Sequence, residues 1–234
     1  MFADIHSHII PFVDDGAEDI PESIKILQMM AAQGITSVAA TPHFHPNICP
    51  QPSIHAAVVA EQLEILKKNL PEGLPNIILG HEVSYFRGIS MSDDIASLKM
   101  GKSEFFLLEL PYENFAPRIE DEIMEFSLNT GFRIILAHVE RYANFSWFPG
   151  ILEIIKNGFA QAQAGCDSIV DSRRSKNTLK LIQEGYISFI ATDAHSSTLR
   201  PPLMADAYDI IVKKLGSSLA DTIKYNAESA ISLM

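Results

Sequence analysis

The chain alternates between short apolar segments and longer segments in which apolar residues recur at helical spacing. A polar turn, or one containing proline or glycine, follows each short segment, which is typical of β-strands. Seven strands are predicted in this way, over residues 2–5, 37–40, 77–79, 105–108, 133–137, 160–163 and 188–191. The longer segments predict helices over residues 20–33, 53–69, 93–99, 117–129, 150–157, 176–184, 204–215 and 218–233.

The ends of the predicted helices carry sequence signals that support this division. Pro21 and Pro52 stand near helix starts, where the missing amide hydrogen of proline costs nothing. A glycine, which stops a helix by adopting the left-handed conformation, follows four of them, at Gly34, Gly131, Gly158 and Gly185. Seven successive strand–helix units predict an α/β fold with a parallel sheet, and at this length a closed barrel. We therefore expect a single domain over residues 1–234.

Composition limits the classes of partner. The 234 residues are 47% hydrophobic and 20% charged, as in globular proteins, with a formal net charge of −11. An acidic chain without a block of Lys and Arg is not expected to bind nucleic acid. No apolar run is long enough for membrane insertion, and the N-terminus lacks the cationic segment of a signal peptide. With only two cysteines, Cys49 and Cys166, a cytoplasmic location is expected.

Residues that can bind metal ions follow six of the seven predicted strands. In parallel α/β folds these carboxyl ends are where chemistry gathers. Nine such side chains are found there, namely His6, His8, Asp15, His43, Glu82, Glu109, His138, Asp193 and His195. Imidazole nitrogens and carboxylate oxygens suit Zn, Mn and Fe, and nine ligands are more than one ion requires. We therefore expect two or three metal ions.

Single members of this set also have ordinary structural explanations. A lone His-x-His pair is most often part of a core or a surface, and Asp14-Asp15 alone is typical of a turn or a helix N-cap. Glu109 fits such an explanation poorly, because a carboxylate directly after the apolar run 105–108 is costly to bury without a partner. The coincidence at six strand ends favours the metal interpretation.

At these residues the chain resembles the polymerase and histidinol phosphatase (PHP) superfamily, metal-dependent phosphoesterases with a distorted (β/α)7, TIM-like barrel. More narrowly, it is similar to bacterial tyrosine phosphatases of the CpsB/CapC type, which regulate capsule and exopolysaccharide synthesis. The resemblance covers nearly the whole chain, from His6 to about Arg200. It is carried by the segments DIHSHIIPFVDDGA, ATPHFHP, GHE at residues 80–82, LLELPY, AHVERY and ATDAHSSTLRPP.

The resemblance implies a role for each of these positions. It assigns one ion to His6, His8, Glu82 and Asp193, a second to Glu82, Glu109 and His138, and a third to Asp15, His43 and His195. It favours manganese, with Fe, Zn, Co or Mg as alternatives. Arg141 and Arg200 match the family's phosphate-contacting arginines, whose planar guanidinium suits phosphate geometry.

The implied reaction is hydrolysis of phosphotyrosine on protein, with an autophosphorylated bacterial tyrosine kinase as the expected substrate and phosphate as a product. A hydroxide bridging two ions would attack phosphorus directly, while Arg141 and Arg200 stabilise the developing charge. Asp193 or His195 could help to protonate the leaving group. The chain departs from the family pattern over residues 166–172, where Cys166 replaces a serine and the following glycines are absent. This departure leaves the shape of one active-site loop, and therefore the substrate preference, open.

Four other functions fit part of the pattern. A cysteine phosphatase needs Cys and Arg separated by five residues, but six residues separate Cys166 from Arg173. An amidohydrolase also opens with His-x-His, but it commonly uses a carboxylated lysine, and no lysine stands at a predicted strand end. A PHP-type small-molecule phosphatase, acting for example on histidinol phosphate, and a non-catalytic metal-binding regulator remain open.

Five further residues have two interpretations each. Tyr112, Phe115 and Trp147 could form a wall for the phosphotyrosine ring or could belong to the core. Arg173 and Arg174 could be a solvent-exposed helix start or could steer an acidic peptide towards the site.

Overall fold

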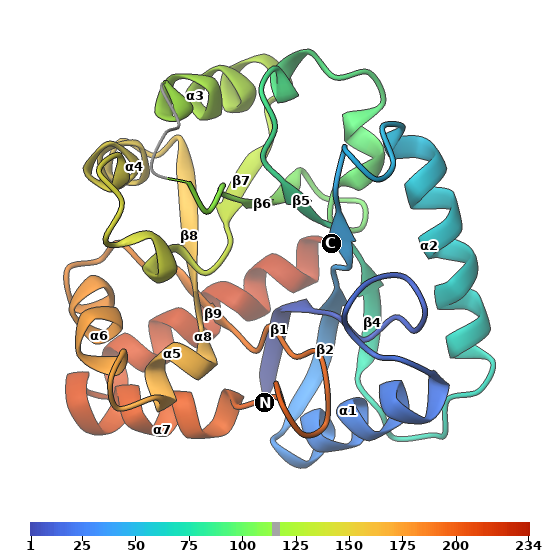
Figure 1. Ribbon diagram of the computed structural model, residues 1–234. Helices are drawn as coiled ribbons and strands as arrows, with labels where there is room; N and C mark the ends of the chain where they lie inside the picture. The colour runs from blue at the N-terminus through green and yellow to red at the C-terminus, as the bar shows by residue number, and fades with distance from the viewer. Residues whose placement is uncertain (114–117) are drawn as a thin grey trace.

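The computed structural model describes residues 1–113 and 118–234, and within them parallel β-strands lie at the centre with helices around them (Figure 1). All seven predicted strands are confirmed, with bounds that agree to within a few residues. Two very short strands, β3 and β5, are present that the sequence does not predict. The strands are β1 (Phe2–Ser7), β2 (Ile35–Ala40), β3 (His43–Phe44), β4 (Asn76–Leu79), β5 (Glu82–Ser84), β6 (Phe105–Glu109), β7 (Arg133–Leu136), β8 (Ala160–Gly165) and β9 (Phe189–Ala191).

The strands form two parallel sheets, in the orders β1-β2-β4 and β3-β5-β6-β7-β8-β9. The chain passes from the first sheet to the second twice, because β3 follows β2 and β5 follows β4 after only two residues. On the other side, an isolated parallel bridge joins Ser7 to Ala194, and the amide of Asp193 donates to the carbonyl oxygen of His6 at 3.0 Å. These links give the α/β fold the arrangement of a distorted TIM-like barrel.

The predicted helices are also present, with two differences. The helices are α1 (Ile20–Ala32), α2 (Pro52–Lys67), α3 (Ile119–Thr130), α4 (Phe148–Lys156), α5 (Cys166–Val170), α6 (Ser175–Gln183), α7 (Met204–Leu215) and α8 (Ser217–Leu233). Shorter 3₁₀ helices are η1 (Ile89–Met91), η2 (Ile95–Leu98) and η3 (Val139–Tyr142). The helix predicted over residues 93–99 is only the 3₁₀ turn η2, and α5 was not predicted. The predicted helix over residues 117–129 corresponds to α3, but its expected first residue, 117, lies outside the described residues.

Helix α8 lies against the amino ends of the strands and so leaves their carboxyl ends free. Its Ala227, Ala230 and Ile231 are buried in one apolar cluster with strand residues such as Ile5 and Leu107. The side-chain amide of Asn226 donates to the carbonyl of Ser188, just before β9, at 3.0 Å. The polar strand ends identified in the sequence lie on the opposite side. Within the described part of the chain, no helix has the length and hydrophobicity needed to cross a membrane.

Candidate metal centre

The structure brings the nine predicted ligands together at the carboxyl ends of the strands. Three groups of side chains have ligand atoms within 4.8 Å of one another. They are His8, Asp15, His43 and His195; His6, His8 and Asp193; and His43, Glu82 and Glu109. His138 joins the last group, since its Nε2 lies 2.8 Å from Glu82 Oε1 and 3.7 Å from Glu109 Oε1.

The first predicted ligand set is compact and completely buried. His6 Nε2 and His8 Nε2 lie 3.1 Å apart. Each of these nitrogens is 3.3 Å from Glu82 Oε2 and 3.4 Å from Asp193 Oδ1. Two imidazole nitrogens and two carboxylate oxygens therefore converge on one point, as the ligands of a single ion would.

The far nitrogens of two imidazoles have acceptors that fix their tautomers. His8 Nδ1 lies 2.7 Å from Asp14 Oδ2, and His195 Nδ1 lies 2.9 Å from the carbonyl oxygen of Asp193. A carbonyl or carboxylate oxygen can only accept, so Nδ1 carries the hydrogen in both rings. When the rings are neutral, the Nε2 lone pairs of both are then directed at the centre, which is the arrangement that metal-binding histidines require.

His6 is oriented in the same way by Gln163, a residue not singled out in the sequence. Gln163 Oε1 accepts from the backbone amide of His138 at 3.0 Å and lies 3.1 Å from His6 Nδ1. Gln163 stands on β8 at the same end as the ligands, and Asp14 directly precedes the predicted ligand Asp15. The sequence signal was the position near a predicted strand end for Gln163 and the position beside a candidate ligand for Asp14.

Four buried atoms of the candidate ligands lack any hydrogen-bond partner among the described residues. They are Glu82 Oε2, His43 Nδ1, His138 Nδ1 and His195 Nε2. A buried carboxylate oxygen without a partner costs more than 1 kcal/mol, and a bound cation would remove that cost. The donor set contains only nitrogen and oxygen atoms, so it fits divalent ions such as Mn, Fe, Co and Zn.

The electrostatics of the centre favour charged carboxylates. Burial opposes ionisation of Glu82 and Asp193, but the neighbouring imidazoles outweigh it and hold the pKa of both carboxyls well below its usual value. Burial and the nearby His8 lower the pKa of His195 to about 3, so its imidazole is neutral and available as a ligand.

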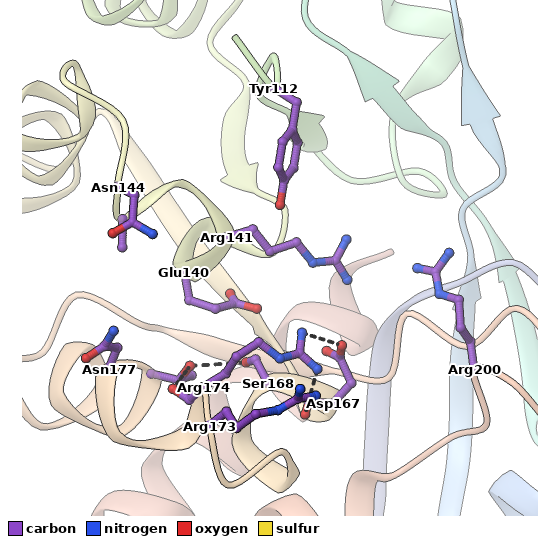
Figure 2. Close-up of a pocket in the computed structure, with 12 residues that line it drawn as sticks. Tyr112, Glu140, Arg141, Asn144, Asp167, Ser168, Arg173, Arg174, Asn177 and Arg200 are labelled. Carbon is purple, nitrogen blue, oxygen red and sulfur yellow. Dashed lines mark hydrogen bonds and ion pairs between the residues drawn. The ribbon is translucent and has the colours of Figure 1, made fainter. Parts of the chain in front are cut away.

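Asp193 connects the ligand cluster to two arginines. Its Oδ1 faces His6 and His8, while its Oδ2 accepts from Arg141 Nη2 at 2.5 Å and from Arg200 Nη2 at 2.7 Å. Figure 2 shows the two guanidinium groups extending into one cavity from opposite sides. This cavity has a volume of about 670 Å³. Both predicted phosphate contacts therefore lie immediately beside the candidate metal centre.

Two residues of the centre have a backbone conformation that L-amino acids rarely adopt. The φ angle is +32° at His138 and +49° at Asp193. Such conformations cost about 1 kcal/mol or more and persist where the surroundings hold them. The amide of His138 is held by Gln163 and that of Asp193 by the carbonyl of His6, so each ligand is tied to a neighbouring strand.

Comparison with known proteins decides the family. A model of the family described as "Capsular polysaccharide synthesis, CpsB/CapC" matches residues 2–232. The chain belongs to the CpsB/CapC family.

Relatives in this family are named as phosphatases. The chain is 28% identical over 232 residues to the tyrosine-protein phosphatase YwqE of Bacillus subtilis (strain 168), covering 96% of this chain and 89% of that protein. It is 26% identical over 246 residues to the tyrosine-protein phosphatase CpsB of Streptococcus agalactiae serotype III, covering 97% of both.

Solved structures agree with this assignment. Crystal structures of YwqE from B. subtilis and CpsB from Streptococcus pneumoniae are described as those of "unique metal-dependent tyrosine phosphatases". One matches with a TM-score of 0.82 and 25% identity, over 99% of this chain and 95% of that chain. A histidinol phosphate phosphatase from Lactococcus lactis matches with a TM-score of 0.54 and 15% identity, over 92% of this chain and 94% of that chain. This second likeness shows the fold alone.

The loop in which this CpsB/CapC member departs from the expected pattern forms the short helix α5. Cys166, its first residue, is completely buried, with its Sγ 4.0 Å from the sulfur of Met204. Its side chain therefore packs in the core and does not line the cavity. Asp167 and Ser168 instead line the cavity beside Arg141.

Of the two candidate aromatic residues that the structure describes, Tyr112 is placed to contact a substrate and Trp147 is not. Tyr112 is 61% exposed and lines the cavity. Trp147 is only 9% exposed, stacks on Phe145 and donates its Nε1–H to the carbonyl of Glu113 at 2.8 Å, so it belongs to the core. Phe115 lies outside the described residues.

Proposed function

We propose that this member of the CpsB/CapC family is a metal-dependent phosphatase that hydrolyses phosphotyrosine on protein. The observation that carries the proposal is the position of Asp193, which joins the cluster of nine candidate ligands to two arginines in one cavity. The names of YwqE and CpsB support phosphotyrosine as the substrate class. An autophosphorylated tyrosine kinase acting in capsule synthesis is the partner that we infer, in the cytoplasm, with residues 1–234 working as one domain.

We infer two or three divalent ions, with manganese as the first choice, held by the nine side chains of the centre. When bound, they would lower the pKa of a water molecule and withdraw charge from the phosphate. The residues of the chain hold and orient the substrate. Arg141 and Arg200 each use one N–H on Asp193 and keep other donors for phosphate oxygens, since a guanidinium has five.

The leaving group needs little help from an acid. A tyrosine phenol has a pKa near 10, so its phenolate leaves more readily than an alkoxide. Asp193 accepts from two guanidinium groups, and the Nδ1 hydrogen of His195 is donated to a carbonyl. We therefore assign both residues to metal binding rather than to proton donation.

A cysteine-dependent mechanism is disfavoured by the surroundings of Cys166. Burial raises the pKa of its thiol well above the usual value, and a thiol without its thiolate form is a poor nucleophile. We expect Cys166→Ser to retain kcat/KM on a phosphotyrosine peptide within about threefold. Loss of activity in a folded variant with a normal metal content would restore the cysteine mechanism.

The proposed function is tested by comparing three substrates. Initial rates would be measured on a phosphotyrosine peptide, the matched phosphoserine peptide and histidinol phosphate, each with added Mn²⁺ and with a chelator. We expect the highest turnover on phosphotyrosine, its loss with chelator and its recovery with Mn²⁺. Faster turnover of histidinol phosphate would assign a small-molecule phosphatase instead. No chelator-sensitive turnover of any substrate would reject the enzyme.

A further inference from the structure

Five basic side chains continue outward from the two phosphate-site arginines over α6 and α7. We call them the basic strip, which consists of Arg173, Arg174, Lys176, Lys180 and Lys214. Arg173 and Arg174 line the same cavity as Arg141 and Arg200 (Figure 2). The three lysines line a neighbouring cavity of about 600 Å³, and Asn177 lines both cavities. The strip is therefore continuous with the candidate phosphate site.

The two arginines of the strip are oriented by acidic neighbours without being covered. Arg174 Nη1 donates to Asp167 Oδ2 at 2.9 Å and its Nε to Asp171 Oδ2 at 3.0 Å. Arg173 lies 3.3 Å from the same carboxylate, yet its side chain is 88% exposed. Both guanidinium groups therefore keep free donors on the wall of the cavity.

Most of the positive charge of the basic strip that no carboxylate neutralises lies on the three lysines. Lys180 lies 3.7 Å from Glu184, whereas among the described residues no carboxylate pairs with Lys176 or Lys214, and none lines their cavity. The chain has only 18 basic residues against 29 acidic ones, so a cavity lined by three lysines and no carboxylate is a local positive patch on an acidic protein. Such a patch attracts anionic groups and repels cationic ones.

We propose that the basic strip binds acidic residues that flank the phosphotyrosine, so that the substrate is an acidic segment of a protein chain. This inference rests on the proposed function. A peptide fits better than a nucleic acid because the cavity also presents the side-chain amides of Asn144 and Asn177 beside the arginines (Figure 2). Such amides can donate to and accept from a peptide backbone. Phosphate held by Arg141 and Arg200 would place the flanking residues along α6.

The test compares three substrates in three proteins. The substrates are a phosphotyrosine peptide flanked by Glu and Asp, the same peptide with Gln and Asn, and p-nitrophenyl phosphate. The proteins are the wild type, the triple variant Lys176→Ala/Lys180→Ala/Lys214→Ala, and the control triple variant Lys67→Ala/Lys68→Ala/Lys213→Ala. The control removes the same total charge from positions in, or directly after, helices α2 and α7 that line neither cavity.

We expect the wild type to show a KM about 5- to 20-fold lower for the acidic peptide than for the neutral one, and high salt to abolish the difference. The strip variant should lose this preference and keep its kcat/KM on p-nitrophenyl phosphate, while the control variant should keep both. Equal KM values for the two peptides in the wild type, or the same loss in the control variant, would overturn the inference. The inference would also be overturned if an oligonucleotide inhibited p-nitrophenyl phosphate hydrolysis competitively and more strongly than the acidic peptide does. Absence of turnover on all three substrates would instead reject the proposed function.

Discussion

At the residue scale, Asp193 holds the candidate site together because its two oxygens face different partners. One oxygen lies near His6 and His8, and the other accepts from Arg141 and Arg200. The arginines are thus held beside the ligand cluster before any phosphate binds. Preorganised donors of this kind stabilise charge without having to reorganise during the reaction.

Removing one of these donors should slow the reaction without removing the metal. We expect Arg141→Ala to lower kcat/KM on a phosphotyrosine peptide by about 10²- to 10³-fold. Arg141→Lys should recover only part of this loss, because an ammonium cannot bind two phosphate oxygens side by side. Metal content, measured on the same samples, should stay at the wild-type level. A loss of less than about threefold in Arg141→Ala would remove this residue from the phosphate site.

Gln163 should influence metal binding without being a ligand. Its carbonyl oxygen holds both the His6 ring and the backbone of His138, so Gln163→Leu leaves two buried donors unpaired. We expect Mn²⁺ affinity to fall by about 10- to 100-fold, as measured by titration calorimetry. Gln161→Leu is the matched control on the same strand, because the Gln161 amide oxygen has no partner among the described residues. Equal affinities in the two variants would contradict an orienting role for Gln163.

At the element scale, the two shortest strands have the largest effect on the site. β3 and β5 pair in parallel with His43 opposite Glu82, which brings these two ligands side by side. Two residues separate each of these strands from the longer strand before it, and there the chain moves from one sheet to the other. The change of sheet therefore places His43 and Glu82 beside each other at the strand ends, where the candidate ligands converge.

The link between β1 and β9 contains a buried carboxyl whose protonation should affect stability. Asp4 Oδ1 accepts from the Thr192 amide at 3.0 Å, and Oδ2 from its hydroxyl at 2.5 Å. Burial raises the pKa of Asp4 from 3.8 to about 6. Between about pH 4 and pH 6 the folded state binds this proton more tightly than the unfolded chain does. The free energy of unfolding should therefore fall by about 3 kcal/mol as the pH rises through this range, and change no further above it.

Asp4→Asn should lack this contribution, because the amide is neutral at every pH and can still bond Thr192. Urea unfolding of both proteins with metal chelated, at about pH 4.5, 5.5 and 7, measures the difference. The variant should gain stability relative to the wild type as the pH rises. Parallel pH curves would show that the Asp4 carboxyl does not titrate in this range.

At the scale of the whole molecule, the ligand cluster ties together distant parts of the chain. His6 comes from the first strand and His195 from the segment after the last, and the other candidate ligands come from the strands and turns between them. An ion bound only by the folded arrangement stabilises the fold in proportion to the logarithm of its concentration. The fold and the centre should therefore be coupled thermodynamically.

This coupling predicts that Mn²⁺ raises the melting temperature. At about 100 times its dissociation constant, one ion should add about 3 kcal/mol, which corresponds to roughly 5–10 °C for a chain of this size. Arg200→Ala should keep this rise, because the arginine is not a predicted ligand. Glu82→Gln should lose most of it, because Glu82 lies between several imidazoles. A melting temperature that rises equally in Glu82→Gln would place the ions elsewhere.

Periodicity and position along the chain were sufficient to predict the strands, most helices and the nine candidate ligands, whereas Arg141 and Arg200 came from the family resemblance. Strand and helix periods are local properties, and parallel strands place their carboxyl ends together whatever the exact topology. The nine side chains of the candidate centre could therefore be expected to lie together without coordinates. The sequence also lacks an apolar run long enough to span a membrane, and none of the described helices could do so.

Only the tertiary structure decided which side chains share partners and which are buried. The joint hold of Arg141 and Arg200 on Asp193, the orienting role of Gln163 and the burial of Cys166 depend on contacts between residues far apart in sequence. The basic strip likewise forms where α6 and α7 bring Lys180 and Lys214 to one cavity. Local patterns cannot encode such contacts, because packing between elements determines side-chain neighbours.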